Sequence, residues 1–149
     1  MYASERIIDQ VLKVHDAFAI CAPTISQYAA LTALKATDGK QGEGDMFIQE
    51  LTTALDSRRQ LICQRLDNLS HIFSYQKPKG AYYIFPKIML EGINSMDLAL
   101  KLLYEAKVIT TPGNGFGPTG EGHIRLSYGG TEQQINRAFD RLDEWAKKQ

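Results

Sequence analysis

The chain has 149 residues, of which 44% are hydrophobic and 23% charged, and its 17 basic and 17 acidic residues give a formal net charge of zero at pH 7. This length and composition suit a globular domain with a sizeable core, and the balanced charge gives no general attraction to nucleic acid or anionic membranes. No apolar run is long enough for a transmembrane helix, and the N-terminal segment lacks an apolar signal core. We therefore expect a cytoplasmic protein that binds neither nucleic acid nor membranes.

The first part of the chain predicts helices. Residues 4–18 carry apolar side chains at helical spacing, with Ser4 as a candidate N-cap. A second helix over residues 24–36 opens with the T-x-x-Q capping-box pattern of Thr24 and Gln27. Because this helix is apolar on nearly all sides, we expect it to be buried between layers or at an interface. A glycine-containing loop over 38–44 and a long helix over 45–69 follow.

The second part of the chain predicts an α/β domain with α+β character. Four short segments with strand patterns alternate with turns and helices, and the predicted strands cover 72–75, 81–85, 108–111 and 123–128. A helix from residue 94 or 95 to 106 and a final helix to 146, opened by a second T-x-x-Q box at Thr131 and Gln134, complete the pattern. We expect a mostly antiparallel sheet of three or four strands with packed helices. The predicted domains are residues 1–42 and 43–149.

The most informative stretch for chemistry is the sequence PGNGFG at residues 112–117, followed by GEGHIRLSYG at 120–129. A glycine-dense loop allows the backbone to approach a ligand closely. Arg125 stands inside an otherwise apolar strand, so its guanidinium needs a partner or a cleft. Two parallel hydrogen bonds to a ligand carboxylate would satisfy it, and so would a salt bridge within the domain.

These segments resemble the C-terminal signature of class I and II aminotransferases of fold type I, which reads roughly PGxxFGxxGxxxxRxSxA/G. The stretch PKGAYYIFP at residues 78–86 resembles the PxGAFYxFP strand of that family, and APTISQYAA at 22–30 resembles the segment that opens a helix near its dimer interface. The resemblance is closest to aspartate and aromatic aminotransferases. It implies that residues 43–149 form the small C-terminal domain and that residues 1–42 are the end of the large, cofactor-binding domain.

The resemblance also implies roles for individual residues. Arg125 would grip the α-carboxylate of the substrate, Phe116 would line the active site, and Asn114 in the same loop is a further substrate-binding candidate. The parent enzyme would use pyridoxal 5'-phosphate to move an amino group between an amino acid and a 2-oxo acid, and would be a homodimer. The sequence does not indicate which amino acid is used.

One departure from the family pattern concerns the cofactor lysine. In the family this lysine follows a serine in an S-x-S-K context, and no lysine of this chain stands in that context. Transamination depends on that amine. We therefore expect the chain to be a fragment that begins shortly after the missing lysine, that contains no catalytic residue, and that neither binds the cofactor covalently nor catalyses transamination alone.

Other candidate sites are weaker. His15, His71 and His123 are scattered without metal-ligand spacing and are predicted to be surface or structural side chains. The cysteines, Cys21 and Cys63, are predicted to be buried thiols rather than a disulfide or a metal pair. Two other functions remain open at this stage, because the same fold serves as the effector-binding module of some transcription regulators and a stand-alone binding domain could also reuse it.

Overall fold

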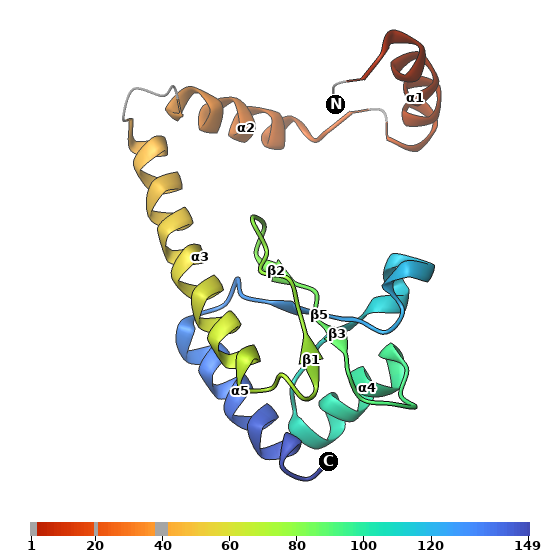
Figure 1. The fold of residues 1–149 in the computed structure, drawn as a ribbon. Helices are drawn as coiled ribbons and strands as arrows, with labels where there is room; N and C mark the ends of the chain where they lie inside the picture. Colours follow the sequence, from red (N-terminus) through yellow and green to blue (C-terminus); the bar gives the residue numbers. More distant parts are fainter. Residues whose placement is uncertain (1–2, 20, 38–41) are drawn as a thin grey trace. The chain divides into compact units, whose positions relative to one another are not determined.

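The computed structural model describes residues 3–19, 21–37 and 42–149 (Figure 1). The chain divides into two compact units, Met1–Gln49 and Glu50–Gln149, called here the N-terminal unit and the C-terminal unit. Helix α3 (Glu43–Asp67) contains residues of both units. The domain boundary predicted between residues 42 and 43 stays a prediction, and residues 38–41 of the predicted loop lie outside the described residues.

The N-terminal unit contains α1 (Glu5–Phe18), α2 (Thr24–Ala36) and the start of α3. The capping box predicted for α2 is wrong. Pro23 is the N-cap, it forms no side-chain cap bond, and the Gln27 amide donates instead to the Ala22 carbonyl oxygen at 2.8 Å. Neither α1 nor α2 has a buried residue among those described, so the burial predicted for α2 does not occur within this chain.

The C-terminal unit contains the sheets, and all their strand pairs are antiparallel, as predicted. A three-stranded sheet has the order β2 (Tyr83–Ile84), β5 (Ile124–Ser127), β4 (Thr111–Pro112), and a two-stranded sheet pairs β1 (Phe73–Ser74) with β3 (Lys87–Ile88). The third predicted strand begins later than expected, at Thr111, and β3 was not predicted because a strand was expected to end at Pro86.

Two helical segments pack on these strands. The predicted helix ending at residue 106 is confirmed as α4 (Ser95–Lys101), which continues as one π-helical turn, Leu102–Ala106. Helix α5 (Glu132–Ala146) begins with the predicted capping box: the Gln134 backbone N–H donates to the Thr131 hydroxyl at 3.2 Å, and the Thr131 N–H donates to the Gln134 side chain at 2.9 Å. The second half of α3 lies beside α5 (Figure 1), held by Arg65, whose guanidinium contacts two carboxylates of α5 at 2.7 and 2.8 Å.

One hydrophobic core lies between the sheets and these helices. Its largest fully buried apolar side chains are Tyr128, Phe73, Ile62, Leu66, Ile72, Ile84, Leu98, Leu102, Ile124 and Leu142. Cys63 is buried at its edge as predicted, whereas Cys21 is exposed, because the N-terminal unit has no described core to receive it. Within residues 3–19, 21–37 and 42–149, no helix combines the length and apolarity needed to cross a bilayer.

Candidate functional site

Strand β5 places Arg125 on the face of the sheet opposite the core. Its neighbours Ile124 and Leu126 are buried, whereas Arg125 is half-buried, as the alternation of a strand requires. The register sets Arg125 directly opposite Thr111 of β4, and β2 pairs on the other side with Tyr83 opposite Ser127. Side chains of both neighbouring strands can therefore reach the guanidinium.

The guanidinium of Arg125 contacts a hydroxyl and two aromatic rings. Nη2 donates to Thr111 Oγ1 at 3.3 Å, and Cζ lies 4.3 Å from the ring centroid of Tyr83 and 5.0 Å from that of Phe116. Both distances are within the range of cation–π attraction. The ion pairs found in the described part of the chain involve Arg59 and Arg65 and not Arg125. The internal salt bridge left open by the sequence is therefore not the arrangement found.

A tightly folded loop brings Phe116 to this position. The loop consists of two short 3₁₀ turns, Gly113–Phe116 and Pro118–Gly120. The backbones of Gly113 and Gly120 touch, so a Cβ on either residue would overlap the carbonyl oxygen of the other. Only glycine permits this approach. Gly113 and Gly120 thus allow the two ends of the loop to come into contact. The ring of Phe116, which lies between them in the sequence, is left half-exposed.

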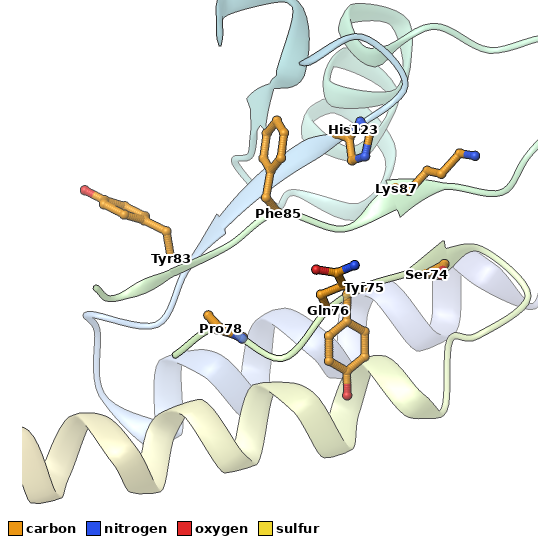
Figure 2. A pocket seen from close by; sticks show the side chains of 8 residues that line it. All are labelled: Ser74, Tyr75, Gln76, Pro78, Tyr83, Phe85, Lys87 and His123. Carbon is orange, nitrogen blue, oxygen red and sulfur yellow. The ribbon is translucent and has the colours of Figure 1, made fainter. Parts of the chain in front are cut away.

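A pocket of about 570 Å³ adjoins this cluster of rings. In Figure 2 its labelled residues lie in two rows, with Phe85 and His123 in one row and Tyr75 and Gln76 in the other. The complete lining is Ser74, Tyr75, Gln76, Pro78, Tyr83, Phe85, Lys87 and His123. The Phe85 ring stacks on His123 with centroids 5.0 Å apart and meets Phe116 edge-on at 5.6 Å. Tyr83 therefore belongs both to the pocket and to the surroundings of Arg125, and Phe85 connects the pocket to Phe116.

The electrostatics of the cluster favour a neutral phenol beside the arginine. The interaction with the Tyr82 side chain, together with burial, raises the pKa of Tyr83 above its ordinary value of 10.0, although Arg125 acts in the opposite direction. Tyr83 is therefore uncharged at neutral pH and cannot neutralise the guanidinium. The positive charge of Arg125 remains available to an incoming anion.

The structure brings two of the three predicted site residues together. Arg125 and Phe116 are in contact, as described above. Asn114 is exposed in the same loop, and its backbone N–H donates to the Ser95 hydroxyl at 3.2 Å. No hydrogen bond or ring contact joins Asn114 to Arg125 among the described residues. The substrate-binding roles of all three residues stay proposals.

Residues that the sequence did not single out complete the cluster. Tyr83 covers Arg125, and His123, predicted to be a surface or structural side chain, lines the pocket. Thr111 was predicted only as part of a strand. A signal was present in the aromatic-rich segment 81–85, but the register that sets Tyr83 opposite Ser127, beside Arg125, is not visible in the sequence alone.

The residues around Arg125 fit a carboxylate but not a pyridoxal phosphate. That cofactor needs an amine for covalent attachment, donors for its phosphate and an acidic partner for its ring nitrogen. The contacts of Arg125 supply a hydroxyl and two aromatic rings. In the described part of the chain no group of His, Cys, Asp or Glu side chains could hold a metal ion either.

The fold of the chain is that of the C-terminal part of fold type I aminotransferases. It superimposes on the aromatic aminotransferase of Pyrococcus horikoshii with a TM-score of 0.81 and 34% sequence identity, covering 98% of this chain and 37% of that one. The family model described as aminotransferase class I and II matches residues 1–142. The chain therefore belongs to the class I and II aminotransferase family.

Curated relatives agree with this assignment. The chain is 33% identical to aromatic-amino-acid aminotransferase 2 of Thermococcus litoralis, over 98% of this chain and 36% of the relative. It is 36% identical to an aspartate aminotransferase of Pyrococcus abyssi, over 93% of this chain and 34% of the relative. The chain thus spans about a third of the length of the relatives that it matches.

Proposed function

We propose that this chain is the C-terminal, carboxylate-binding part of a pyridoxal-phosphate-dependent aminotransferase that moves an amino group between an amino acid and a 2-oxo acid. The observation that carries the proposal is the state of Arg125. It is half-buried, its Cζ lies 4.3 and 5.0 Å from the centroids of two aromatic rings, and no carboxylate of the described chain pairs with it. Family membership supplies the reaction class.

The residues of the cluster have complementary parts in binding the α-carboxylate. The planar guanidinium of Arg125 donates two parallel hydrogen bonds to the two carboxylate oxygens. The Thr111 hydroxyl accepts a hydrogen bond from Nη2 and so fixes the plane of the guanidinium. The rings of Tyr83 and Phe116 keep water from the faces of the guanidinium, which strengthens its attraction for the anion.

The carboxylate is the substrate feature that this site recognises. One relative is named for aromatic amino acids and another for aspartate, and the identities of 33% and 36% do not separate the two. Both kinds of amino acid carry the same α-carboxylate, which is the group that Arg125 would hold. The proposed substrate class is therefore an amino acid and a 2-oxo acid, with the side chain left open.

Pyridoxal 5'-phosphate would supply the electron sink for amino-group transfer in the parent enzyme. The 149-residue polypeptide alone is proposed to be inactive and to bind no cofactor covalently, because no lysine stands in the S-x-S-K context. Purified chain is incubated with pyridoxal 5'-phosphate, reduced with borohydride and mapped by mass spectrometry. We expect scattered, substoichiometric labelling of surface lysines. A stoichiometric adduct at one lysine would contradict this part of the proposal.

The proposed protein partner is a second copy of the chain. Large apolar side chains lie around α2 at Ile25, Tyr28, Leu31 and Leu34, called here the apolar surface of α2, and all four are exposed. Isolated helices of this length are marginal in water, and soluble proteins rarely leave such a surface uncovered. A homodimer that covers part of this surface would stabilise the helix.

The clamp is tested in a chimera that joins this chain to the part of the Pyrococcus horikoshii aromatic aminotransferase that this chain does not cover, where the family pattern places the cofactor lysine. Arg125→Lys keeps the charge but removes the fork, and we expect kcat/KM to fall roughly 100-fold because the substrate is misplaced. The matched control is Arg137→Lys, at an exposed position of α5. The absorbance change of the bound cofactor on adding amino acid reports the reaction. Equal activity of both variants would refute the clamp.

A further inference from the structure

Both ends of the glycine-rich loop are tied to the start of α4 by one carboxylate and one hydroxyl. Glu121 Oε1 accepts from the backbone N–H groups of Ser95 and Gly122 at 2.7 and 2.8 Å. Its other oxygen accepts from the Ser95 hydroxyl at 3.0 Å. The same hydroxyl accepts from the backbone N–H of Asn114 at 3.2 Å. The hydrogen bonds of Ser95 therefore reach both the beginning of the loop at Asn114 and its end at Glu121.

This arrangement satisfies a polar side chain that is otherwise costly to bury. Ser95 is fully buried, at 0% exposure. Its hydroxyl donates one hydrogen bond and accepts one in the network, so both its donor and its acceptor are satisfied. Hydrogen bonds to an ionised carboxylate are shorter and stronger than those between neutral groups. The network is therefore a firm connection between the loop and α4.

The connection is not needed to cap α4. Asn94 is the N-cap of that helix, and its side chain accepts from the Asp97 backbone N–H at 2.9 Å. The cap and the Ser95–Glu121 pair use different donors, so each can be removed separately. What the pair adds beyond the cap is a fixed position for the loop.

The fixed loop matters because of what it carries. Phe116 lies between the two tied ends, and its ring is 5.0 Å from Arg125 Cζ and 5.6 Å from the Phe85 ring. We propose that Ser95 and Glu121 are positioning residues that hold Phe116 over Arg125 and so set the orientation in which the guanidinium meets a carboxylate. This inference rests on the proposed clamp role of Arg125.

The charge state of Glu121 agrees with the network. The backbone N–H groups of Ser95 and Gly122 hold the pKa of its carboxyl below the ordinary value of 4.5. The folded carboxylate thus stays ionised above that value, and its hydrogen bonds are lost only as the pH falls through the lowered pKa. His123, just before β5, is a titratable neighbour whose Nδ1 lies 3.2 Å from the Glu121 backbone carbonyl oxygen.

Amide hydrogen exchange of the 149-residue chain tests the connection. Glu121→Gln is made at an exposed position and keeps the reach of the side chain, whereas Ser95→Ala removes the hydroxyl. We expect exchange in residues 113–120 to become at least about tenfold faster in both variants. Asn94→Ala is the matched control, which should speed exchange at the start of α4 and leave the loop unchanged. Unchanged loop exchange in Glu121→Gln would overturn the proposal.

Two further measurements separate positioning from general stability. In nuclear magnetic resonance titrations the amide signals of Ser95 and Gly122 should shift with one common midpoint below pH 4.5, and Glu121→Gln should abolish it. Modification of Arg125 by phenylglyoxal should be faster in Glu121→Gln than in Asn94→Ala. Equal rates in the two variants, or separate midpoints, would count against positioning. These measurements do not depend on turnover. If Arg125→Lys left the activity of the chimera unchanged, the clamp would be refuted, and the positioning of the loop by Ser95 and Glu121 could still be judged separately.

Discussion

The two units of the chain use their apolar side chains in opposite ways. In the C-terminal unit, leucines and isoleucines of α3, α4 and α5 are buried against the sheets, and Leu66, Leu98 and Ile124 have 0% exposure. In the N-terminal unit, Phe18, Ile25 and Leu34 are exposed by 87%, 81% and 71%. Both units are rich in helical patterns, so the pattern alone does not produce a core. A helix needs a surface to pack against, and only the C-terminal unit contains one among the residues described.

The largest expected effect sharpens this contrast with one substitution in each unit. Leu66→Ala in the core should lower the free energy of unfolding by about 2–5 kcal/mol, because it removes buried methyl groups and leaves a cavity. In the monomeric chain, Leu31→Ala in α2, where the side chain is 46% exposed, should change it by less than about 0.5 kcal/mol. Urea unfolding followed by circular dichroism, at a protein concentration low enough to keep the chain monomeric, measures both. A similar loss in both variants would show that Leu31 is packed within the monomer.

The second prediction concerns the surface that the N-terminal unit leaves exposed. We expect the 149-residue chain to self-associate through the apolar surface of α2. Introducing charge with Leu31→Lys and Leu34→Lys should convert the associated species to monomer, because a buried unpaired ammonium is strongly disfavoured. Sedimentation velocity at high micromolar concentration reports the mass. A monomeric wild-type chain at that concentration would contradict the prediction.

A matched pair is Arg137→Glu and Arg141→Glu on α5, which also changes two exposed positions but lies outside α2. This variant should associate as the wild type does. Loss of association in both double variants would indicate a general effect of charge and would argue against a specific interface on α2.

The third prediction compares the same sequence motif in the two units. Thr131 caps α5 through the Gln134 N–H, so Thr131→Ala should lower the unfolding free energy by about 1 kcal/mol. Thr24 forms no cap bond, because Pro23 is the N-cap of α2. Thr24→Ala should therefore have almost no effect, since alanine also has the higher helix propensity. Thermal and urea unfolding of both variants provide the comparison.

The two T-x-x-Q motifs also show how far the sequence predicts the fold. Both predict a helix start, and both helices begin within a residue of the expected position. The hydrogen bonds differ, because Gln27 turns back to the Ala22 carbonyl whereas Gln134 completes the box. Local propensity thus determines the element, and the side-chain geometry depends on surroundings that the motif does not contain.

The strands and the site depend more heavily on contacts between distant residues. Strand β3 was missed because Pro86 was expected to end the preceding strand, yet Lys87 and Ile88 pair with β1 far back in the chain. Arg125 and Phe116 were found because the family motif contains both. Tyr83 was not singled out, because its contact with Arg125 arises from the register of β2 on β5. Register is set by the whole sheet and not by either strand.

The smallest expected effect distinguishes a binding arginine from a structural one within the C-terminal unit. Arg125→Leu should lower the free energy of unfolding by less than about 1 kcal/mol, because Arg125 is only half-buried and its removal breaks only a hydroxyl contact and two ring contacts. Arg65→Leu is the comparison, since it leaves the carboxylates of Asp140 and Asp143 on α5 without their partner. Arg65→Leu should lower the free energy of unfolding by more, about 1.5–3 kcal/mol, because the hydrogen bonds that it removes join charged groups. Urea unfolding with unchanged m values measures both. If Arg125→Leu instead cost roughly 3–5 kcal/mol, as removing one partner of a buried ion pair does, Arg125 would be a structural residue of the sheet and the proposed carboxylate clamp would be wrong.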